Sequence, residues 1–156
     1  MSLIGWLKGN RLVDVTAQDP LPVQQQGAIT TRAADTLLVA TTTVTTTNRD
    51  LWENTNTETP TLDNCGQYRK LVWFYFRAGN AATTYRILAR TTDLSAQPLG
   101  TGWQIIADDE LPGGANSWGR IEIPITDGYY DQYRIEVYRT DGNNYTLTSK
   151  VIGVRG

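Results

Sequence analysis

The sequence contains no histidine and a single cysteine, Cys65. Histidine is the most common general base and metal ligand, so its absence excludes the Ser-His-Asp and Cys-His catalytic arrangements. A lone cysteine cannot form a disulfide within the chain, and stability must therefore come from packing or assembly. The surrounding residues "DNCGQ" place no basic group beside the thiol, so we expect Cys65 to be structural.

Long apolar runs and a strong charge imbalance are also missing. The 156 residues include 14 basic and 16 acidic side chains, for a formal charge of -2, which gives no long-range reason to bind nucleic acid or an anionic membrane. No apolar run approaches the roughly 20 residues of a membrane-spanning helix. The opening "MSLIGWLKGNRL" lacks the apolar length and cleavage pattern of a signal peptide. We expect no nucleic-acid partner, no membrane association and synthesis in a cytoplasm.

What the sequence does contain is a series of strand signals. The stretch "TLLVATTTVTTT", residues 36–47, is β-branched nearly throughout, and "RIEIPI", residues 120–125, alternates apolar and polar residues. Seven or eight such segments are separated by turns rich in Gly, Asp and Asn, and no segment is convincingly helical. The pattern predicts an all-β fold over residues 36–156, an antiparallel β-sandwich with jelly-roll connections or a barrel as variants. Pro124 indicates that the strand of residues 120–125 lies at a sheet edge or contains a bulge.

The segment "RKLVWFYFR", residues 69–77, is apolar on both faces of a strand. One face carries Val72, Phe74 and Phe76, and the other carries Leu71, Trp73 and Tyr75. This favours a central strand covered on both sides, or one whose outer face meets a partner. We assign Trp73 and Tyr75 to self-association.

The threonine run "TTTVTTT", residues 41–47, must have one face that is exposed to solvent or in contact with another chain. Threonine pairs between strands are favourable, so pairing between subunits is one interpretation. A plain solvent-facing strand is the other, and the sequence leaves both open.

Residues 1–35 show no sustained periodicity, although "RLVDVT" predicts a short strand. Pro20 and Pro22 favour extended backbone and do not fit a central strand. A short extended arm cannot bury enough of itself to be stable alone. We therefore predict an arm over residues 1–35 that docks on a neighbouring subunit or on the surface of another protein through its apolar side chains: Ile4, Trp6, Leu7, Leu12, Val13, Leu21 and Val23.

Candidate catalytic and metal-binding groups are few. Glu122 and Glu136 lie on neighbouring strand patterns, and a glycosidase needs two carboxylates flanking one bond. Both alternate away from the apolar face, which is typical of solvated strand residues. The acidic run Asp108 to Glu110 lacks the spacing of a calcium loop, and no nucleotide-binding fingerprint is present. We predict no enzymatic activity, no cofactor and no metal.

The aromatic composition favours binding, since the chain has five Trp and eight Tyr but only two Phe. Trp and Tyr combine apolar area with a polar group, which suits both protein interfaces and sugar-binding platforms. Such side chains can also close the ends of a core. Five lie in or beside expected loops and form the candidate glycan platform: Trp52, Trp103, Trp118, Tyr129 and Tyr130.

Two segments resemble small virion proteins of tailed phages. "VDVTAQDPLPV", residues 13–23, looks like their entry segment, in which V-D-V-T/S runs into P-L-P-V before a Thr-rich first strand. "YYDQYRIEVYRTDGNNYTLTSKVIGVRG", residues 129–156, is similar to their closing hairpin. Neither segment is a strict motif, and together they cover about a quarter of the chain.

The resemblance implies a binding role in a particle. The leading interpretation is a capsid decoration (cement) protein of the virion, made in the host bacterial cytoplasm. It would form a homo-oligomer, expected to be a trimer, and would bind the major capsid protein or another virion protein. A head-fibre, tail or adaptor component and a carbohydrate-binding module are the alternatives, and a hydrolase using Glu122 and Glu136 ranks last.

Overall fold

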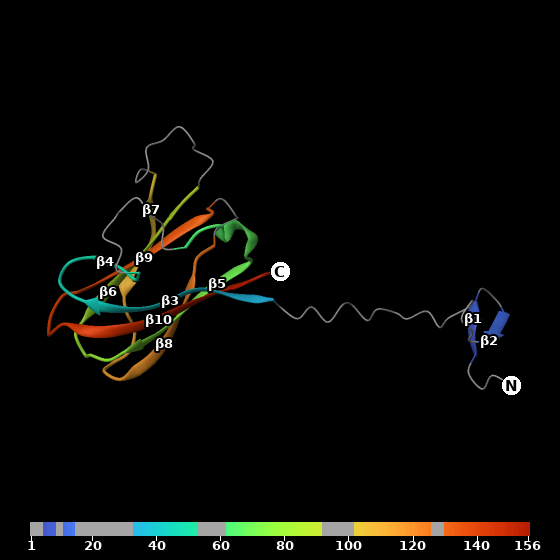
Figure 1. Ribbon diagram of the computed structural model, residues 1–156, viewed down its shortest axis with the longest axis horizontal. Coiled ribbons are helices and arrows are strands. Elements are labelled where there is room, and N and C mark those ends of the chain that lie inside the picture. The colour runs from blue at the N-terminus through green and yellow to red at the C-terminus, as the bar shows by residue number, and fades with distance from the viewer. Residues whose placement is uncertain (1–4, 9–10, 15–32, 53–61, 92–101, 126–129) are drawn as a thin grey trace. The chain divides into compact units, whose positions relative to one another are not determined.

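The chain divides into two compact units, Met1–Thr31 and Arg32–Gly156, in a computed structural model (Figure 1). The structure describes residues 5–8, 11–14, 33–52, 62–91, 102–125 and 130–156. The first strand of the larger unit begins at Ala34, so residues 34 and 35, which the sequence analysis assigned to the arm, belong to the body.

The N-terminal unit contains two short antiparallel strands, β1 (Gly5–Lys8) and β2 (Arg11–Asp14). Strand β2 lies within the segment "RLVDVT", where a short strand was predicted, whereas its pairing with β1 was not foreseen. Trp6 lies opposite Val13, and Leu7 lies opposite Leu12. The side chains of these four residues, together with Ile4, Leu21 and Val23, lie outside the described part of the structure, so docking of the arm stays a prediction.

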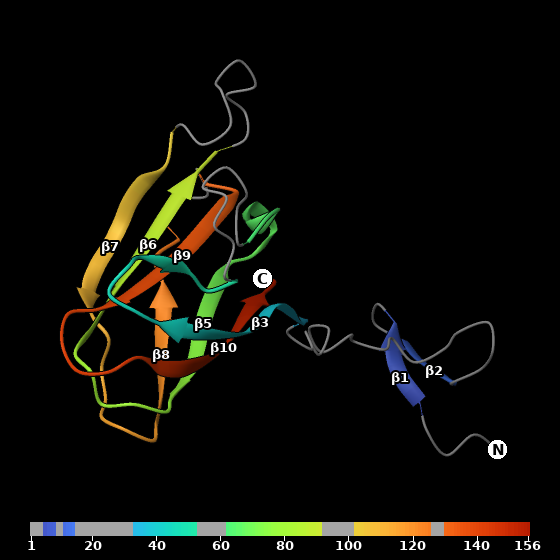
Figure 2. The same ribbon diagram turned by 60° about the vertical axis from the view of Figure 1, so that its left-hand side comes forward.

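The larger unit, called the body below, is a sandwich of two four-stranded antiparallel sheets (Figure 2). Sheet I has the order β3-β10-β5-β8, and sheet II has the order β4-β9-β6-β7. The strands are β3 (Ala34–Val44), β4 (Arg49–Asp50), β5 (Lys70–Arg77), β6 (Thr83–Arg90), β7 (Gln104–Glu110), β8 (Ser117–Ile123), β9 (Gln132–Arg139) and β10 (Tyr145–Val154). A 3-10 turn, η1 (Cys65–Gln67), precedes β5.

The strand order confirms the predicted β-sandwich and selects the jelly-roll form. The first strand of the body, β3, pairs with its last strand, β10, and the chain crosses repeatedly from one sheet to the other. Eight strands divided between two sheets in this way make a jelly roll. Strand β8 lies at an edge of sheet I and ends just before Pro124, in agreement with the predicted edge position.

The core lies between the sheets, and strands from both contribute alternate residues to it. From sheet I come Leu71, Trp73 and Leu147, and from sheet II come Ile87 and Ile135, all fully buried. Each such side chain contributes on the order of 1.5–3 kcal/mol relative to an exposed position. In β6, buried residues alternate with half-buried ones from Thr83 to Ala89.

The assignment of Trp73 and Tyr75 to self-association was wrong in its choice of face. Their side chains are only 0% and 1% exposed, and the ring of Trp73 lies 5.1 Å from that of Tyr75 and 5.8 Å from that of Tyr85 on sheet II. A partner cannot reach them without opening the sandwich. The opposite face of β5, with Val72, Phe74 and Phe76, is the outer one.

Three tyrosine rings lie against glycines, and each glycine is required by close approach. A Cβ at Gly119 would lie 2.2 Å from atoms of the Tyr75 ring, its cross-strand neighbour. The other two pairs have corresponding distances to the ring of 2.5 Å and 2.6 Å, and they are Gly79 with Tyr145 and Gly153 with Tyr68. These pairs fit large rings at positions where a methyl group would clash.

A buried arginine holds two loops to the end of β5. Arg77 is 3% exposed, and its guanidinium donates to the carbonyl oxygens of Leu111 (2.8 Å), Gly113 (2.5 Å) and Ala81 (2.6 Å). Charge-assisted hydrogen bonds of this kind are stronger than neutral ones. They fix the β5–β6 and β7–β8 connections relative to each other.

Candidate functional site

The outer face of sheet I is largely apolar. Cross-strand pairing places Val39 beside Lys150, then Phe74, then Arg120 in one row across the four strands. The next row runs through Thr41, Thr148, Phe76 and Trp118. We call this surface the apolar face, and its members are Val39, Thr41, Val72, Phe74, Phe76, Trp118, Arg120, Thr148, Lys150 and Ile152.

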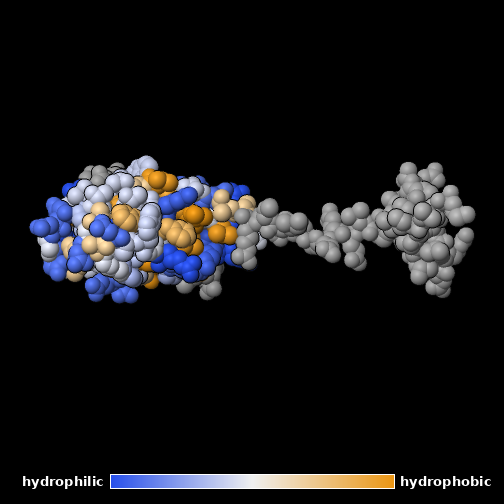
Figure 3. All heavy atoms as spheres, turned by 90° about the horizontal axis from the view of Figure 1, so that it is seen from below, coloured by the Kyte–Doolittle hydropathy of each residue, from blue (hydrophilic) through white to orange (hydrophobic). Residues whose placement is uncertain are grey.

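Two members of the apolar face are unusually exposed for their type, Trp118 at 76% and Val39 at 59%. The Trp118 ring packs on Phe76, with centroids 4.9 Å apart. A hollow of about 460 Å³ lies over the face, lined by Val39, Phe74, Trp118, Thr148, Ser149, Lys150 and Ile152. Figure 3, viewed from below Figure 1, shows hydrophobic residues gathered on the side of the body where β8 and β10 lie. A contiguous apolar patch of this kind marks an interaction surface.

The charges on the apolar face are mainly positive. Lys150 lies between Val39 and Phe74, and Arg120 follows on β8; neither forms an ion pair with another described residue. At the rim, Lys70 and Glu122 lie 2.7 Å apart, and both are well exposed. The face therefore combines apolar side chains with two basic groups that a carboxylate could pair with.

The outer face of sheet II is built from charges instead. Cross-strand pairing sets Asp108, Arg86, Glu136 and Asp50 in one row over all four strands. The Arg86 Nε lies 2.9 Å from Asp108 Oδ2, and its guanidinium carbon is 5.4 Å from the centre of the Tyr138 ring. The ion pair and the adjacent Glu136 raise the pKa of Arg86, chiefly through the hydrogen bond to Asp108. We call this surface the charged face.

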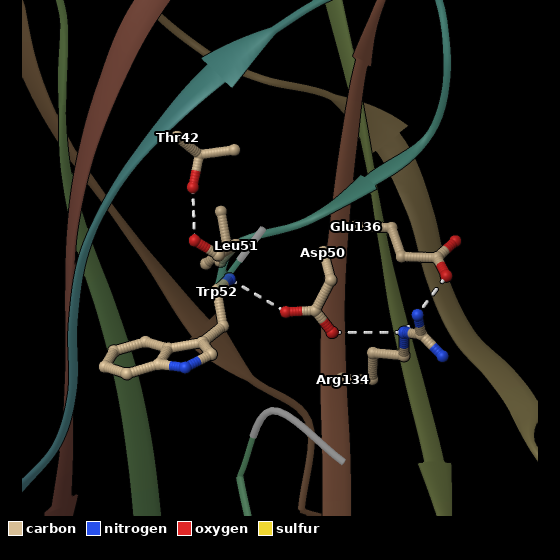
Figure 4. Close-up of polar contacts among 6 residues, drawn as sticks. All are labelled: Thr42, Asp50, Leu51, Trp52, Arg134 and Glu136. Carbon is tan, nitrogen blue, oxygen red and sulfur yellow. Dashed lines mark hydrogen bonds and ion pairs between the residues drawn. The ribbon is translucent and has the colours of Figure 1, made fainter. Parts of the chain in front are cut away.

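The charged face contains a buried ion cluster, shown in Figure 4. Arg134 lies 3.1 Å from Asp50 Oδ2 and 3.2 Å from Glu136 Oε1, and the side chains of Arg134 and Asp50 are only 6% and 0% exposed. The other carboxylate oxygen of Asp50 accepts the backbone N–H of Trp52 at 2.8 Å. Thr42 donates to the carbonyl oxygen of Leu51, which links β3 to the segment after β4.

Further along the charged face, Arg90 lies under an aromatic ring. Its guanidinium carbon is 4.6 Å from the centre of the Trp103 ring, and its Nε donates to Gln132 Oε1 at 2.6 Å. Gln132 in turn donates to Asp63 at 3.0 Å. Arg90 and Gln132 are each only 7% exposed. This polar network fixes the side chains of β6 and β9 rather than leaving them free for a ligand.

The candidate glycan aromatics do not form one platform. Trp118 lies on the apolar face, whereas Trp52, 58% exposed, follows β4 of sheet II. Trp103 packs on Arg90, and Tyr130 donates to the neighbouring Gln104 at 2.7 Å, so these two lie near each other. Tyr129 lies outside the described residues. The set is divided between the two sides of the sandwich.

The two candidate carboxylates also separate. Glu122 extends from the outer side of sheet I toward Lys70, and Glu136 extends from the outer side of sheet II toward Arg134. With the whole core between them, they cannot flank one glycosidic bond.

Burial raises the pKa of the Cys65 thiol to about 12, with smaller contributions from Asp63 and Asp131, so the thiol stays protonated and unreactive at neutral pH.

Asp108 points to Arg86, and the described residues contain no group of three or more His, Cys, Asp or Glu side chains that could hold a metal ion.

The sequence analysis did not predict that one surface contains Val39, Phe76, Trp118 and Lys150. A signal for it was present, because both faces of β5 are apolar. The surface emerges only when β3, β10 and β8 are placed around β5, and that arrangement depends on sheet order, which local patterns do not encode.

No known protein family matches the sequence, and no curated protein matches it either. One solved structure that resembles the chain was described in work on disulfide-linked pili of Bacillus endospore appendages. It is 12% identical, with a TM-score of 0.37 over 80% of this chain and 88% of that chain. Similarity at that level is too weak to support a conclusion. Among the described residues, no helix is long and apolar enough to span a membrane.

Proposed function

We propose that the chain is a structural protein of a tailed-phage particle, acting as a capsid decoration protein that binds its neighbours through the apolar face of sheet I. The observation that carries the proposal is the exposure of Trp118 and Val39 beside Phe74 on an ordered sheet. The resemblance of residues 13–23 and 129–156 to virion proteins supports the assignment to a phage particle. A protein that attaches to a shell needs a rigid, preformed contact surface, which a jelly-roll sheet provides.

The charge of the apolar face defines the kind of partner surface that fits it. The partner, most simply the major capsid protein, would present apolar side chains flanked by carboxylates. These carboxylates would pair with Lys150 and Arg120, and Trp118 would be the main apolar anchor, since aromatic residues dominate binding energy at interfaces. Many copies on one particle would then hold neighbouring subunits together through avidity, even if each contact is weak.

A matched pair of tryptophan variants tests this surface. Trp118→Ser removes the anchor on the apolar face, and Trp52→Ser removes an exposed tryptophan beside sheet II. We expect Trp118→Ser to lower occupancy on particles assembled without the wild-type protein at least tenfold, with Trp52→Ser close to wild type. Equal occupancy for Trp118→Ser and wild type would remove the apolar face from the mechanism.

Imaging of the particle tests the location. We expect density for the protein on the head, and density confined to the tail would favour the fibre or adaptor alternative. A carbohydrate-binding module is the second candidate, since Trp52 is exposed beside the polar charged face. Glycan-array binding that is lost in Trp52→Ser and kept in Trp118→Ser would favour it.

A further inference from the structure

We propose that two copies of the protein associate through the open edge of β3, which pairs antiparallel with β3 of the second copy to make a continuous eight-stranded sheet. The proposal does not depend on the proposed function, because it requires no particle. It concerns the edge of sheet I, whereas the proposed function concerns its face.

Three of the four sheet edges carry features that oppose strand addition. Strand β4 has only two residues, and β7 ends in the acidic run Asp108 to Glu110. Strand β8 carries Arg120 and Glu122 and is followed by Pro124. Short length, charge and proline are the usual ways in which natural proteins protect sheet edges.

Strand β3 has none of this protection over most of its length. It spans eleven residues at the end of sheet I, and no other described strand pairs with its outer side. Residues 36–47 contain no charged residue and no proline. A bulge at Leu37 interrupts the pairing with β10, but the register is regular from Leu38 to Val44. Among the described residues, the outer side of this stretch at Val39 and Thr41 is therefore an open template for another strand.

The backbone groups that point to the open edge follow from the pairing of β10. On the β5 side, Thr146 and Val154 of β10 accept hydrogen bonds from Ala78 and Arg69. Successive strand residues direct their backbone groups to alternate sides, so the odd-numbered residues of β10 bond toward β3. Their β3 partners are Leu38, Ala40, Thr42 and Val44. The backbone groups of the alternate residues, including Val39 and Thr41, point away from β10 toward the open edge.

The stretch "LVATTTV", residues 38–44, is complementary to itself when two copies pair about Thr41. On the core side, Leu38 would lie opposite Val44 of the second copy, and Ala40 opposite Thr42. On the outer side, Thr41 would lie opposite Thr41 of the second copy, and threonine pairs across strands are favourable. No like charges meet in this register. A two-fold contact in which each surface meets itself is also the most common form of homodimer.

The pairing would join the two apolar faces. Val39 is 59% exposed on the outer side of β3, one strand from Lys150 and two from Phe74. In the dimer the Val39 side chains of both copies would lie near the two-fold axis. The hollows over the two sheets would then belong to one extended surface.

The first test is the mass of the full-length protein in solution, measured by light scattering over a range of concentrations. We expect a species of twice the chain mass of 17.4 kDa that dissociates on dilution. A protein that remains monomeric at the highest concentration, or that forms the trimer expected from the resemblance to virion proteins, would overturn the proposal.

Thr41→Lys and Thr148→Lys form a matched pair for the second test. Thr41 and Thr148 are exposed cross-strand neighbours in one row, but only Thr41 is on the edge strand. Thr41→Lys would set two ammonium groups opposite each other and should give a monomer, whereas Thr148→Lys should remain a dimer. Thr41→Pro removes an N–H that points to the open edge, so it should also give a folded monomer. Dimers that persist in both Thr41 variants would refute edge pairing.

A crosslink provides a positive test. In the proposed register the two Thr41 Cα atoms would be roughly 5.5 Å apart, a separation that a disulfide can span. Under mild oxidation Thr41→Cys should form a covalent dimer, and Thr148→Cys should not. Cys65 is buried with a raised pKa and does not compete. Failure of Thr41→Cys to crosslink while the protein is dimeric would place the contact elsewhere.

Discussion

Strands β5 and β9 both occupy inner positions in their sheets and both bury one side in the same core, yet their outer sides differ completely. On β5 the outer residues are Val72, Phe74 and Phe76, and on β9 they include Arg134 and Glu136. The apolar face is open, with Trp118 76% exposed, whereas Arg134 and Asp50 on the charged face are almost fully covered. The charged groups form ion pairs with one another within the chain, whereas the described residues leave much of the apolar face exposed.

This difference teaches that charge content alone does not mark a binding surface. Sheet II has more ionisable groups, but Arg86, Arg90 and Arg134 are held by ion pairs, amide contacts and rings. A ligand would have to break those contacts before it could form its own. Sheet I offers apolar area and two basic groups that are not held in this way, so binding there costs less reorganisation.

The largest expected effect comes from breaking the ion cluster of the charged face. Arg134→Met removes the cation that lies 3.1 Å from the fully buried carboxylate of Asp50, and we expect the free energy of unfolding to fall by about 3–5 kcal/mol. Denaturant unfolding measures this change. Lys70→Met, which breaks the exposed ion pair with Glu122 on sheet I, is the control and should cost no more than about 1 kcal/mol. Similar losses for both variants would contradict the distinction between the faces.

The next effect concerns the support beneath the apolar face. Gly119→Ala adds a methyl group 2.2 Å from the Tyr75 ring, so β8 or the ring must shift. We expect a loss of about 1–3 kcal/mol in unfolding free energy, together with weaker particle binding because Trp118 is the preceding residue. Gly114→Ala is the matched control, since the nearest atom to its added methyl group is 3.7 Å away. An unchanged Gly119→Ala protein would mean that the ring does not require this glycine.

Alkaline pH should act on the groups packed beneath sheet II. Burial raises the pKa of Cys65 from 9.0 to about 12 and that of Tyr133 from 10.0 to about 12. Above pH 9 the unfolded thiol loses its proton while the folded thiol keeps it, so the unfolded state binds fewer protons and stability falls with rising pH. Stability from these groups is present below about pH 9 and is lost by about pH 12.

Thermal unfolding of wild type and Cys65→Ala across that range measures the contribution of the thiol. The variant removes a buried side chain, so it should be less stable at pH 8 but lose less stability between pH 9 and pH 11. Parallel curves for the two proteins would show that the thiol does not ionise on unfolding.

The smallest expected effect on stability comes from Trp118→Ser, since the ring is mostly in solvent and its aromatic contact among the described residues is with Phe76. We expect a loss of about 0.5–1.5 kcal/mol, the usual value of an aromatic pair. The same change should remove the contribution of Trp118 to the tryptophan fluorescence that acrylamide quenches readily. A loss several times larger would show that Trp118 is part of the fold and not chiefly of the binding surface.

Local sequence patterns predicted where the strands lie but not which of their side chains face the core or a partner. The alternation in "RIEIPI" predicted β8, because a half-buried strand repeats every two residues. In β5 both sides are apolar, so periodicity could not show that Trp73 lies inside and Phe74 outside. The buried arginines Arg77 and Arg134 were not foreseen either, because arginine is mostly exposed and their partners come from distant segments.

The pairing of the first and last strands of the body has a mechanical consequence. Ala34 at the start of β3 lies opposite Val154 at the end of β10, so both chain ends leave the sheet at the same point. Tension applied between these two ends would peel β3 and β10 apart from that point, so that their hydrogen bonds carry the load one after another. Strands pulled in shear would instead share the load. The body should thus yield at low force when stretched through its own chain ends, and an anchorage that spares β3 from tension would protect it.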